Sequence, residues 1–201
     1  MIRVRVGTAA DAPLAARLHV SEISEGFLPT LGQPFLETLY RRIVRSPRSF
    51  LLIAERDLEQ IGFVAGTEDV RALYTEFLWH DGFSAARAAL PRVVRSSRRV
   101  LETLRYGVGG HSGAEKANAS DASAAELLAI AVAPDERGHG AGHALVDAFT
   151  GELSVRRVPR ARVVVGADNA PAIALYQRSG FNPTETIEVH RGTASQVLTW
   201  P

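Results

Sequence analysis

The hydrophobic residues of this chain follow two patterns. In some segments they alternate with polar residues or form short runs, which is typical of β-strands; in others they recur every three or four residues, which is typical of helices. The predicted strands cover residues 2–6, 50–54, 61–65, 126–132, 162–165, 184–190 and 196–200. The predicted helices cover residues 8–23, 35–44, 76–106 with a break near Pro91, 137–153 and 169–176. Strands and helices in this mixed order predict an α/β fold.

Three segments are informative about how these elements connect. Polar residues alone separate the apolar runs 50–54 and 61–65, which predicts an antiparallel hairpin. Residues 126–132 are apolar almost throughout after Glu126, so we expect a central strand that is covered on both faces. Residues 26–34 contain two Gly and two Pro and are predicted to form a loop.

An insertion of about residues 70–122 separates the third predicted strand from the fourth. Its first part is predicted to be helical, and residues 87–105 carry six Arg against one Glu. Residues 107–123 are rich in Gly, Ala and Ser and lack large apolar side chains, so we expect a flexible loop there. With a length of 201 residues, the chain is predicted to form one domain over residues 1–201 with this insertion.

The composition excludes several classes of protein. The hydrophobic fraction is 46% and the charged fraction 22%, which excludes a wholly disordered chain. Lys and Arg total 23 against 22 Asp and Glu, and a net charge of +1 argues against charge-driven binding of nucleic acid. The chain has no cysteine, which excludes disulfides, thiolate zinc sites and a cysteine nucleophile.

The N-terminus and the apolar runs bear on localisation. Residues 1–6 have no long apolar core and do not resemble a signal peptide. No uninterrupted apolar stretch approaches the roughly 20 residues of a membrane span. We therefore expect a soluble, cytoplasmic protein with no membrane partner.

The clearest chemical signal is a glycine-rich turn between a strand and a helix. Gly138, Gly140 and Gly142 occur within five residues, directly after Arg137 and the buried strand 126–132. Backbone N–H groups converge at such a turn, the helix dipole adds partial positive charge, and Gly allows a ligand to approach closely. The segment therefore predicts an anion-binding site. It is not a Walker motif, since no Gly-Lys-Ser/Thr follows.

Two motifs in this part of the chain resemble those of the GCN5-related N-acetyltransferase (GNAT) family. Residues 130–142 read Ile-Ala-Val-Ala-Pro-Asp-Glu-Arg-Gly-His-Gly-Ala-Gly, which is similar to the family pattern of a hydrophobic strand, Val-x-Pro, and Arg/Gln-x-x-Gly-x-Gly/Ala. The second pattern, Asn-x-x-Ala-x-x-Leu-Tyr-x-x-x-Gly-Phe, is matched by Asn169, Ala172, Leu175, Tyr176, Gly180 and Phe181. The resemblance covers most of the chain except the insertion.

This resemblance implies a fold and a cosubstrate. The fold would have a central, mostly antiparallel sheet flanked by helices, and the cosubstrate would be acetyl-CoA, with no metal. The pyrophosphate would bind the amides of residues 138–142, and the pantetheine arm would pair with the backbone of Ile130 and Val132 as an added strand would. The residues implied in cofactor binding are Ile130, Ala131, Val132, Arg137, Gly138, His139, Gly140, Ala141, Gly142, Asn169, Ala172 and Tyr176.

Acetyl transfer to an amine requires two proton transfers, for which the resemblance suggests residues. An alkylammonium group has a pKa near ~10 and must lose a proton to become nucleophilic, and the departing thiolate is stabilised by a proton donor. Tyr176 lies at the position of that donor, although an aromatic on an amphipathic helix also fits a core role. Glu126 begins an apolar strand and is the candidate base; the alternative is a strand-end residue paired with an Arg. His190 is a competing base.

The predicted function is transfer of an acetyl group to a primary amine. A small acceptor, such as an amino sugar or an amine metabolite, is favoured over a protein N-terminus or a lysine. Two other classes stay open: a CoA-binding protein without turnover, and a nucleic-acid-binding module that uses the Arg-rich insertion. The histidines show no metal-ligand spacing. The sequence leaves open acetyl against a longer acyl group, and monomer against homodimer.

Overall fold

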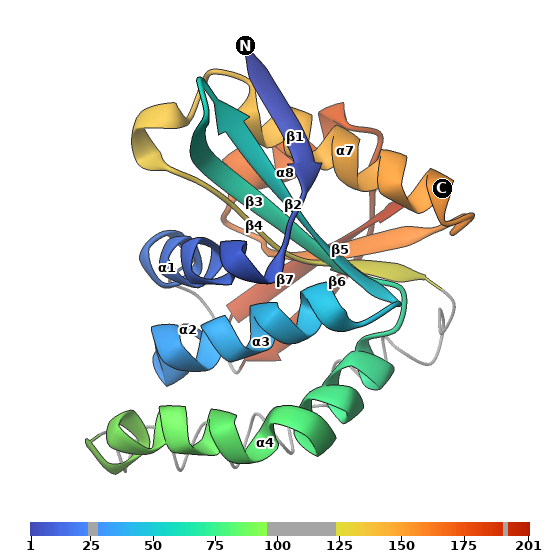
Figure 1. The fold of residues 1–201 in the computed structure, drawn as a ribbon. Coiled ribbons are helices and arrows are strands. Elements are labelled where there is room, and N and C mark those ends of the chain that lie inside the picture. Colours follow the sequence, from blue (N-terminus) through green and yellow to red (C-terminus); the bar gives the residue numbers. More distant parts are fainter. Residues whose placement is uncertain (24–27, 96–123, 191–192) are drawn as a thin grey trace.

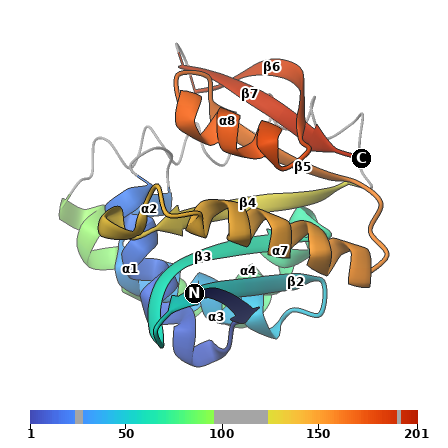
Figure 2. The ribbon, with the colours of Figure 1, turned by 90° about the horizontal axis from the view of Figure 1, so that it is seen from above.

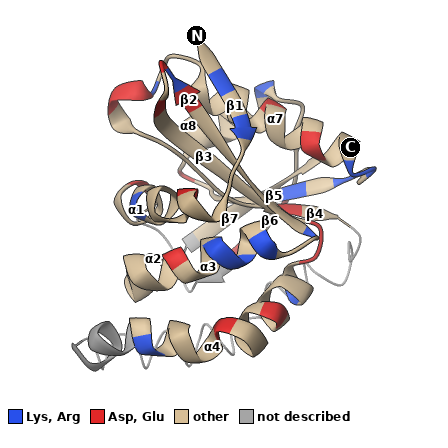
Figure 3. Ribbon diagram, in the orientation of Figure 1, with Lys and Arg blue, Asp and Glu red and all other residues tan. Residues whose placement is uncertain are grey.

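The computed structural model describes residues 1–23, 28–95, 124–190 and 193–201. The predicted flexible loop, residues 107–123, lies outside these ranges, as does the part of the Arg-rich segment after residue 95. Acidic and basic residues are interspersed along the described helices and strands (Figure 3).

A seven-stranded sheet in the order β1-β2-β3-β4-β5-β7-β6 forms the centre of the molecule (Figure 1). The strands are β1 (Ile2–Val6), β2 (Ser49–Arg56), β3 (Glu59–Thr67), β4 (Ala125–Val132), β5 (Ala161–Gly166), β6 (Asn182–His190) and β7 (Thr193–Trp200). Neighbouring strands pair antiparallel except β4 and β5, which are parallel. The mixed α/β fold with a mostly antiparallel sheet, and the β2–β3 hairpin, are therefore confirmed.

Helices cover both faces of this sheet (Figures 1 and 2). One side carries α1 and α3, with α4 packed on α3, and the other carries α7, with α8 next to it over the last strands. The helices are α1 (Ala12–Glu22), α2 (Leu28–Leu31), α3 (Gln33–Arg45), α4 (Val70–Arg95), α7 (Ala141–Val155) and α8 (Ala170–Arg178). Short 3-10 turns span Ala9–Asp11 and Pro134–Glu136.

Two predictions about local structure were wrong. Residues 26–34 were expected to form a loop, but Leu28–Leu31 form a single helical turn and Gln33 begins α3. Pro34 lies in the first turn of α3, where a backbone N–H would have no hydrogen-bond partner within the helix, so proline is tolerated there. A break was expected near Pro91, but α4 continues from Val70 to Arg95. A proline inside a helix costs one hydrogen bond, and the long helix tolerates it.

Two apolar clusters lie on the two faces of the sheet, and β4 contributes to both. Ala125 and Leu127 belong to the cluster beneath α7 and α8, whereas Ala129 and Ala131 belong to the cluster beneath α1, α3 and α4. The change of face occurs at Leu128, because β3 residues Ala65 and Gly66 pair with Ala129 and Leu127 and leave Leu128 as the extra residue of a β-bulge. The bulge changes the direction of β4 just before the candidate site.

Candidate functional site

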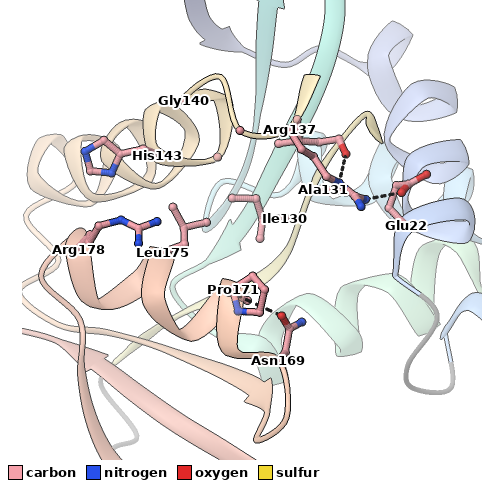
Figure 4. Close-up of a pocket in the computed structure, with 14 residues that line it drawn as sticks. Glu22, Ile130, Ala131, Arg137, Gly140, His143, Asn169, Pro171, Leu175 and Arg178 are labelled. Carbon is pink, nitrogen blue, oxygen red and sulfur yellow. Dashed lines mark hydrogen bonds and ion pairs between the residues drawn. The ribbon is translucent and has the colours of Figure 1, made fainter. Parts of the chain in front are cut away.

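A pocket of about 920 Å³ opens where β4 separates from β5 (Figure 4). The two strands pair only from Ala125 to Leu127, opposite Ala161 to Val163, and run apart beyond that point (Figure 2). The pocket is lined by Glu22, Ile130, Ala131, Val132, Arg137, Gly138, Gly140, Gly142, His143, Asn169, Pro171, Ala172, Leu175 and Arg178. A sheet edge is thus exposed inside a pocket, where an extended ligand can pair with it.

The backbone of β4 forms one wall of the pocket. Ile130 pairs with Val64 of β3 and Val132 pairs with Gly62, so the opposite edge of this part of β4 faces the opening. The backbone groups on that edge have no β5 partner beyond Leu127. They can donate to and accept from a ligand with amide groups, as a pantetheine arm has.

The glycine-rich turn closes the end of the pocket at the start of α7. Gly138 has φ of +77° and Gly140 has φ of +90°, a region that side chains other than Gly rarely adopt. A Cβ added to either residue would meet nothing within 4 Å, so the space beside their Cα atoms is open. Gly140 is also the N-cap of α7, which aims the first amides of that helix at the opening. This cradle fits a pyrophosphate group.

Gly142 serves a different purpose from the other two glycines. A Cβ at this position would approach the Cδ2 atom of Leu175 to 3.2 Å, so Gly142 allows α7 to pack closely against α8. The glycines of the motif therefore divide into two that open the cradle and one that brings the two helices together.

Arg137 is held by protein groups at one end of the pocket. Its Nε donates to the carbonyl oxygen of Val132 at 3.2 Å, and its Nη2 donates to Glu22 at the end of α1. The Glu22 side chain is 13% exposed, against 54% for Arg137. The ion pair neutralises much of the charge that the motif provides, and it ties α1 to the turn before α7 (Figure 4).

Asn169 lies at the start of α8 and lines the opposite wall. Its Oδ1 accepts a hydrogen bond from the Ala172 amide at 3.2 Å, which caps the helix. Pro171 follows in the first turn, where proline fits. Of the three predicted cofactor residues of this motif, Asn169 and Ala172 line the pocket and Tyr176 does not.

The opposite end of the pocket from Glu22 carries His143 and Arg178 (Figure 4). His143 Nδ1 lies 3.0 Å from Ser179 Oγ, and His143 Nε2 lies 3.4 Å from Asp147. Both ring nitrogens therefore have protein partners. Arg178 is the last residue of α8, and its side chain is exposed at the pocket.

Tyr176 lies behind the pocket wall. It is 4% exposed and packs against Phe181 with a ring separation of 5.7 Å, and it is not among the residues that line the pocket. Burial raises the pKa of the Tyr176 hydroxyl well above its ordinary value. The hydroxyl is protonated at neutral pH, as an unperturbed tyrosine also is, and the raised pKa makes it a weaker acid.

Glu126 lies beside the point where β4 and β5 separate, outside the pocket lining. Its Oε2 accepts hydrogen bonds from Arg162 Nη2 at 2.7 Å and from Nε at 2.9 Å. The Glu126 side chain is 20% exposed. Side chains alternate along a strand, so Glu126 faces away from α7 and α8, opposite to Leu127. The alternative to a catalytic base was a strand-end residue paired with an arginine, and Arg162 is such a partner.

Three further residues were predicted to belong to the site: His139, Ala141 and His190. His139 is exposed and Ala141 is buried at the start of α7, and neither lines the pocket. His190 ends β6, where its backbone pairs with Thr193, and its side chain lies outside the described structure. The pocket residues that the sequence did not indicate are Glu22, His143, Pro171, Leu175 and Arg178.

Clusters of metal-ligating side chains and membrane-spanning helices are both absent from the described residues. No three His, Asp or Glu side chains among them are grouped to hold a metal ion. None of the helices in the described ranges is long and apolar enough to cross a membrane.

Comparison with known sequences gives one family and several partial relatives. The Acetyltransferase (GNAT) family matches residues 19–181. A mycothiol acetyltransferase from Beutenbergia cavernae is 41% identical over 63 residues, which are 31% of this chain and 21% of that protein. The ribosomal protein bS18-alanine N-acetyltransferase of Escherichia coli is 47% identical over 58 residues, which are 29% of this chain and 39% of that protein. The matches thus span about a fifth and two fifths of these relatives.

Solved structures share the fold over the whole chain. The ribosomal-protein-S18-alanine N-acetyltransferase from Escherichia coli has a TM-score of 0.59 at 18% identity, covering 100% of this chain and 94% of that one. Arabidopsis thaliana NAA60 in complex with acetyl-CoA has a TM-score of 0.60 at 17% identity, covering 100% of this chain and 98% of that one. At these identities the likeness concerns the fold.

Proposed function

This chain belongs to the acetyltransferase (GNAT) family, and we propose that it transfers an acetyl group from acetyl-CoA to a primary amine. GNAT acetyltransferases use acetyl-CoA, which supplies the acetyl group as an activated thioester. One observation carries the proposal: a single pocket joins the open edge of β4 to the uncovered amides of the glycine-rich turn. These two surfaces match the amide-containing arm and the pyrophosphate of CoA.

Binding in this pocket relies mainly on backbone groups. The edge of β4 from Ile130 to Val132 holds the pantetheine arm, and the amides of Gly138, Gly140 and the first turn of α7 hold the pyrophosphate. Fixed amides stabilise negative charge without reorganisation, because the fold has already oriented them.

The reacting groups are proposed to meet where β4 and β5 separate. Glu126 precedes Leu127, the last residue of β4 that pairs with β5, and it faces one side of the sheet. Tyr176 belongs to the apolar cluster on the other side, which also contains Leu127. An acid and a base on opposite sides of the opening suit a transfer in which one proton leaves the amine and another reaches the thiolate.

In this arrangement Tyr176 protonates the departing thiolate. The match of Tyr176 to the tyrosine of the second family motif supports this role, and its hydroxyl carries a proton at neutral pH. Glu126 accepts the proton of the amine, directly or through a water molecule, and Arg162 positions its carboxylate through two hydrogen bonds.

The acceptor is proposed to be a small molecule that carries a primary amine. The name mycothiol acetyltransferase, shared by several relatives, supports a small acceptor. The match to ribosomal protein bS18-alanine N-acetyltransferase supports the competing proposal, a protein N-terminus. A comparison of amines decides between them.

The test measures release of the CoA thiol from acetyl-CoA with a panel of acceptors: an amino sugar, a polyamine, a lysine peptide and a peptide with N-terminal alanine. A reaction without amine controls for hydrolysis. We expect higher kcat/KM with a small amine than with either peptide. Preference for a peptide would contradict the small acceptor, and CoA binding without turnover on a broad panel would contradict the enzymatic function.

A further inference from the structure

The two arginines at the ends of the pocket differ in their partners. Arg137 is held by Glu22 and by the Val132 carbonyl. Arg178 makes no hydrogen bond or ion pair within the described ranges, although it lines the same pocket. An exposed guanidinium that faces a pocket and has no carboxylate partner is a ready ligand for an anion.

The described groups around Arg178 leave its charge unpaired. Ser179, the next residue, contacts His143 of α7 at 3.0 Å, which ties the end of α8 to the first turns of α7. The nearby carboxylate of Asp147 is directed at the other ring nitrogen of His143, at 3.4 Å. The free donors at this end of the pocket are therefore those of the Arg178 guanidinium.

The position of Arg178 defines a second anion site beyond the glycine-rich turn. The backbone edge of β4 and the amides of Gly138 and Gly140 account for the arm and the pyrophosphate of CoA. CoA carries one more phosphate, on the 3′ carbon of its ribose, on the far side of the pyrophosphate from the arm. At the opposite end of the pocket, Arg137 and Glu22 are paired with each other, so Arg137 is not a free cation for this dianion.

We propose that Arg178 binds the 3′-phosphate of CoA and thereby makes the protein select CoA over its dephosphorylated form. The inference rests on the proposed function, because it assumes that the pocket holds CoA. The planar guanidinium can donate two parallel hydrogen bonds to phosphate oxygens, which a neutral side chain cannot reproduce.

The test compares CoA with dephospho-CoA, which lacks only the 3′-phosphate, by calorimetric titration of the full chain. A charged hydrogen-bonded contact is lost with dephospho-CoA, so wild-type protein should bind CoA about 10- to 100-fold more tightly. Arg178→Gln should remove most of this difference by weakening CoA binding alone, with dephospho-CoA binding changed less than about twofold. Arg178 is exposed at a helix end, so the variant retains the packing of the core.

The matched control is Arg17→Gln, which removes an exposed arginine of α1 that does not line the pocket. It should leave the preference for CoA intact. Equal wild-type affinity for the two ligands, or an Arg178→Gln variant that weakens both equally, would overturn the 3′-phosphate site while leaving the CoA pocket standing. Failure of wild-type protein to bind either ligand would overturn both the proposed function and this site.

Discussion

The cradle for the cofactor and the two candidate proton-transfer residues are organised differently. The cradle is open: a Cβ at Gly138 or Gly140 would meet nothing within 4 Å, and the edge of β4 beyond Leu127 has no β5 partner. The proton-transfer residues are enclosed: Tyr176 is 4% exposed, and Glu126 is held by Arg162.

This difference follows from what each region has to provide. A cradle needs unpaired amides, which a turn with positive φ and a strand edge supply through backbone geometry alone. A proton-transfer residue acts through one side-chain atom, and its surroundings set the pKa of that atom; burial raises the pKa of the Tyr176 hydroxyl. Changes in the cradle should therefore affect binding, and changes at the enclosed residues should affect the rate.

The largest effect is expected from blocking the cradle. Gly140→Glu places a side chain and a negative charge in front of the amides, and it should weaken CoA binding by several kcal/mol, more than about 10³-fold. Calorimetry on a folded variant measures this change. Gly140→Ala is the control, because its Cβ meets nothing and only the strain of positive φ, about 1–2 kcal/mol, is added. Unchanged affinity in Gly140→Glu would refute the pyrophosphate site.

A smaller effect, confined to the rate, is expected from Tyr176→Phe. The ring and its packing against Phe181 remain, and only the proton donor is removed. We expect kcat to fall by roughly 10²-fold with little change in acetyl-CoA affinity. Steady-state kinetics and a parallel titration separate these quantities. A variant as fast as wild type would leave Tyr176 with a packing role only.

The smallest effect, and one that depends on pH, is expected from Glu126→Gln. The amide keeps the shape of the side chain but cannot take a proton, so the rate should fall by about tenfold near pH 7, where the amine is protonated. Raising the pH should restore part of the rate, because free amine accumulates without help. Tyr176→Phe is the control, since its leaving group lacks a donor at every pH. Parallel pH–rate profiles for the two variants would contradict the separate roles.

Features set by local sequence were predictable. The strands were visible as alternating or continuous apolar segments, because each must bury at least one face of the sheet. The turn at Gly138 and Gly140 was visible because positive φ at two nearby positions requires glycine. The pocket residues Ile130–Val132 followed from the strand that leads into this turn.

Features that depend on distant residues were not predictable. The partner of Arg137 is Glu22, which is 115 positions away, so the motif alone suggested a free charge where the structure has an ion pair. Arg178 lies at a variable position of the second motif, and only the packing of α8 against α7 directs it to the pocket. The bulge at Leu128 could not be recognised in the sequence, because β4 is apolar on both faces and a change of face does not alter its pattern.

Hydrogen exchange with and without acetyl-CoA tests the central claim most directly. The amides of residues 129–132 that face the opening and those of residues 138–142 should exchange freely in the protein alone. Both segments should be protected together when acetyl-CoA is added, while the edge strand β6, which does not line the pocket, stays unchanged. Protection of only one segment, or protection confined to other elements, would contradict a cofactor site that runs from the open edge of β4 to the glycine-rich turn.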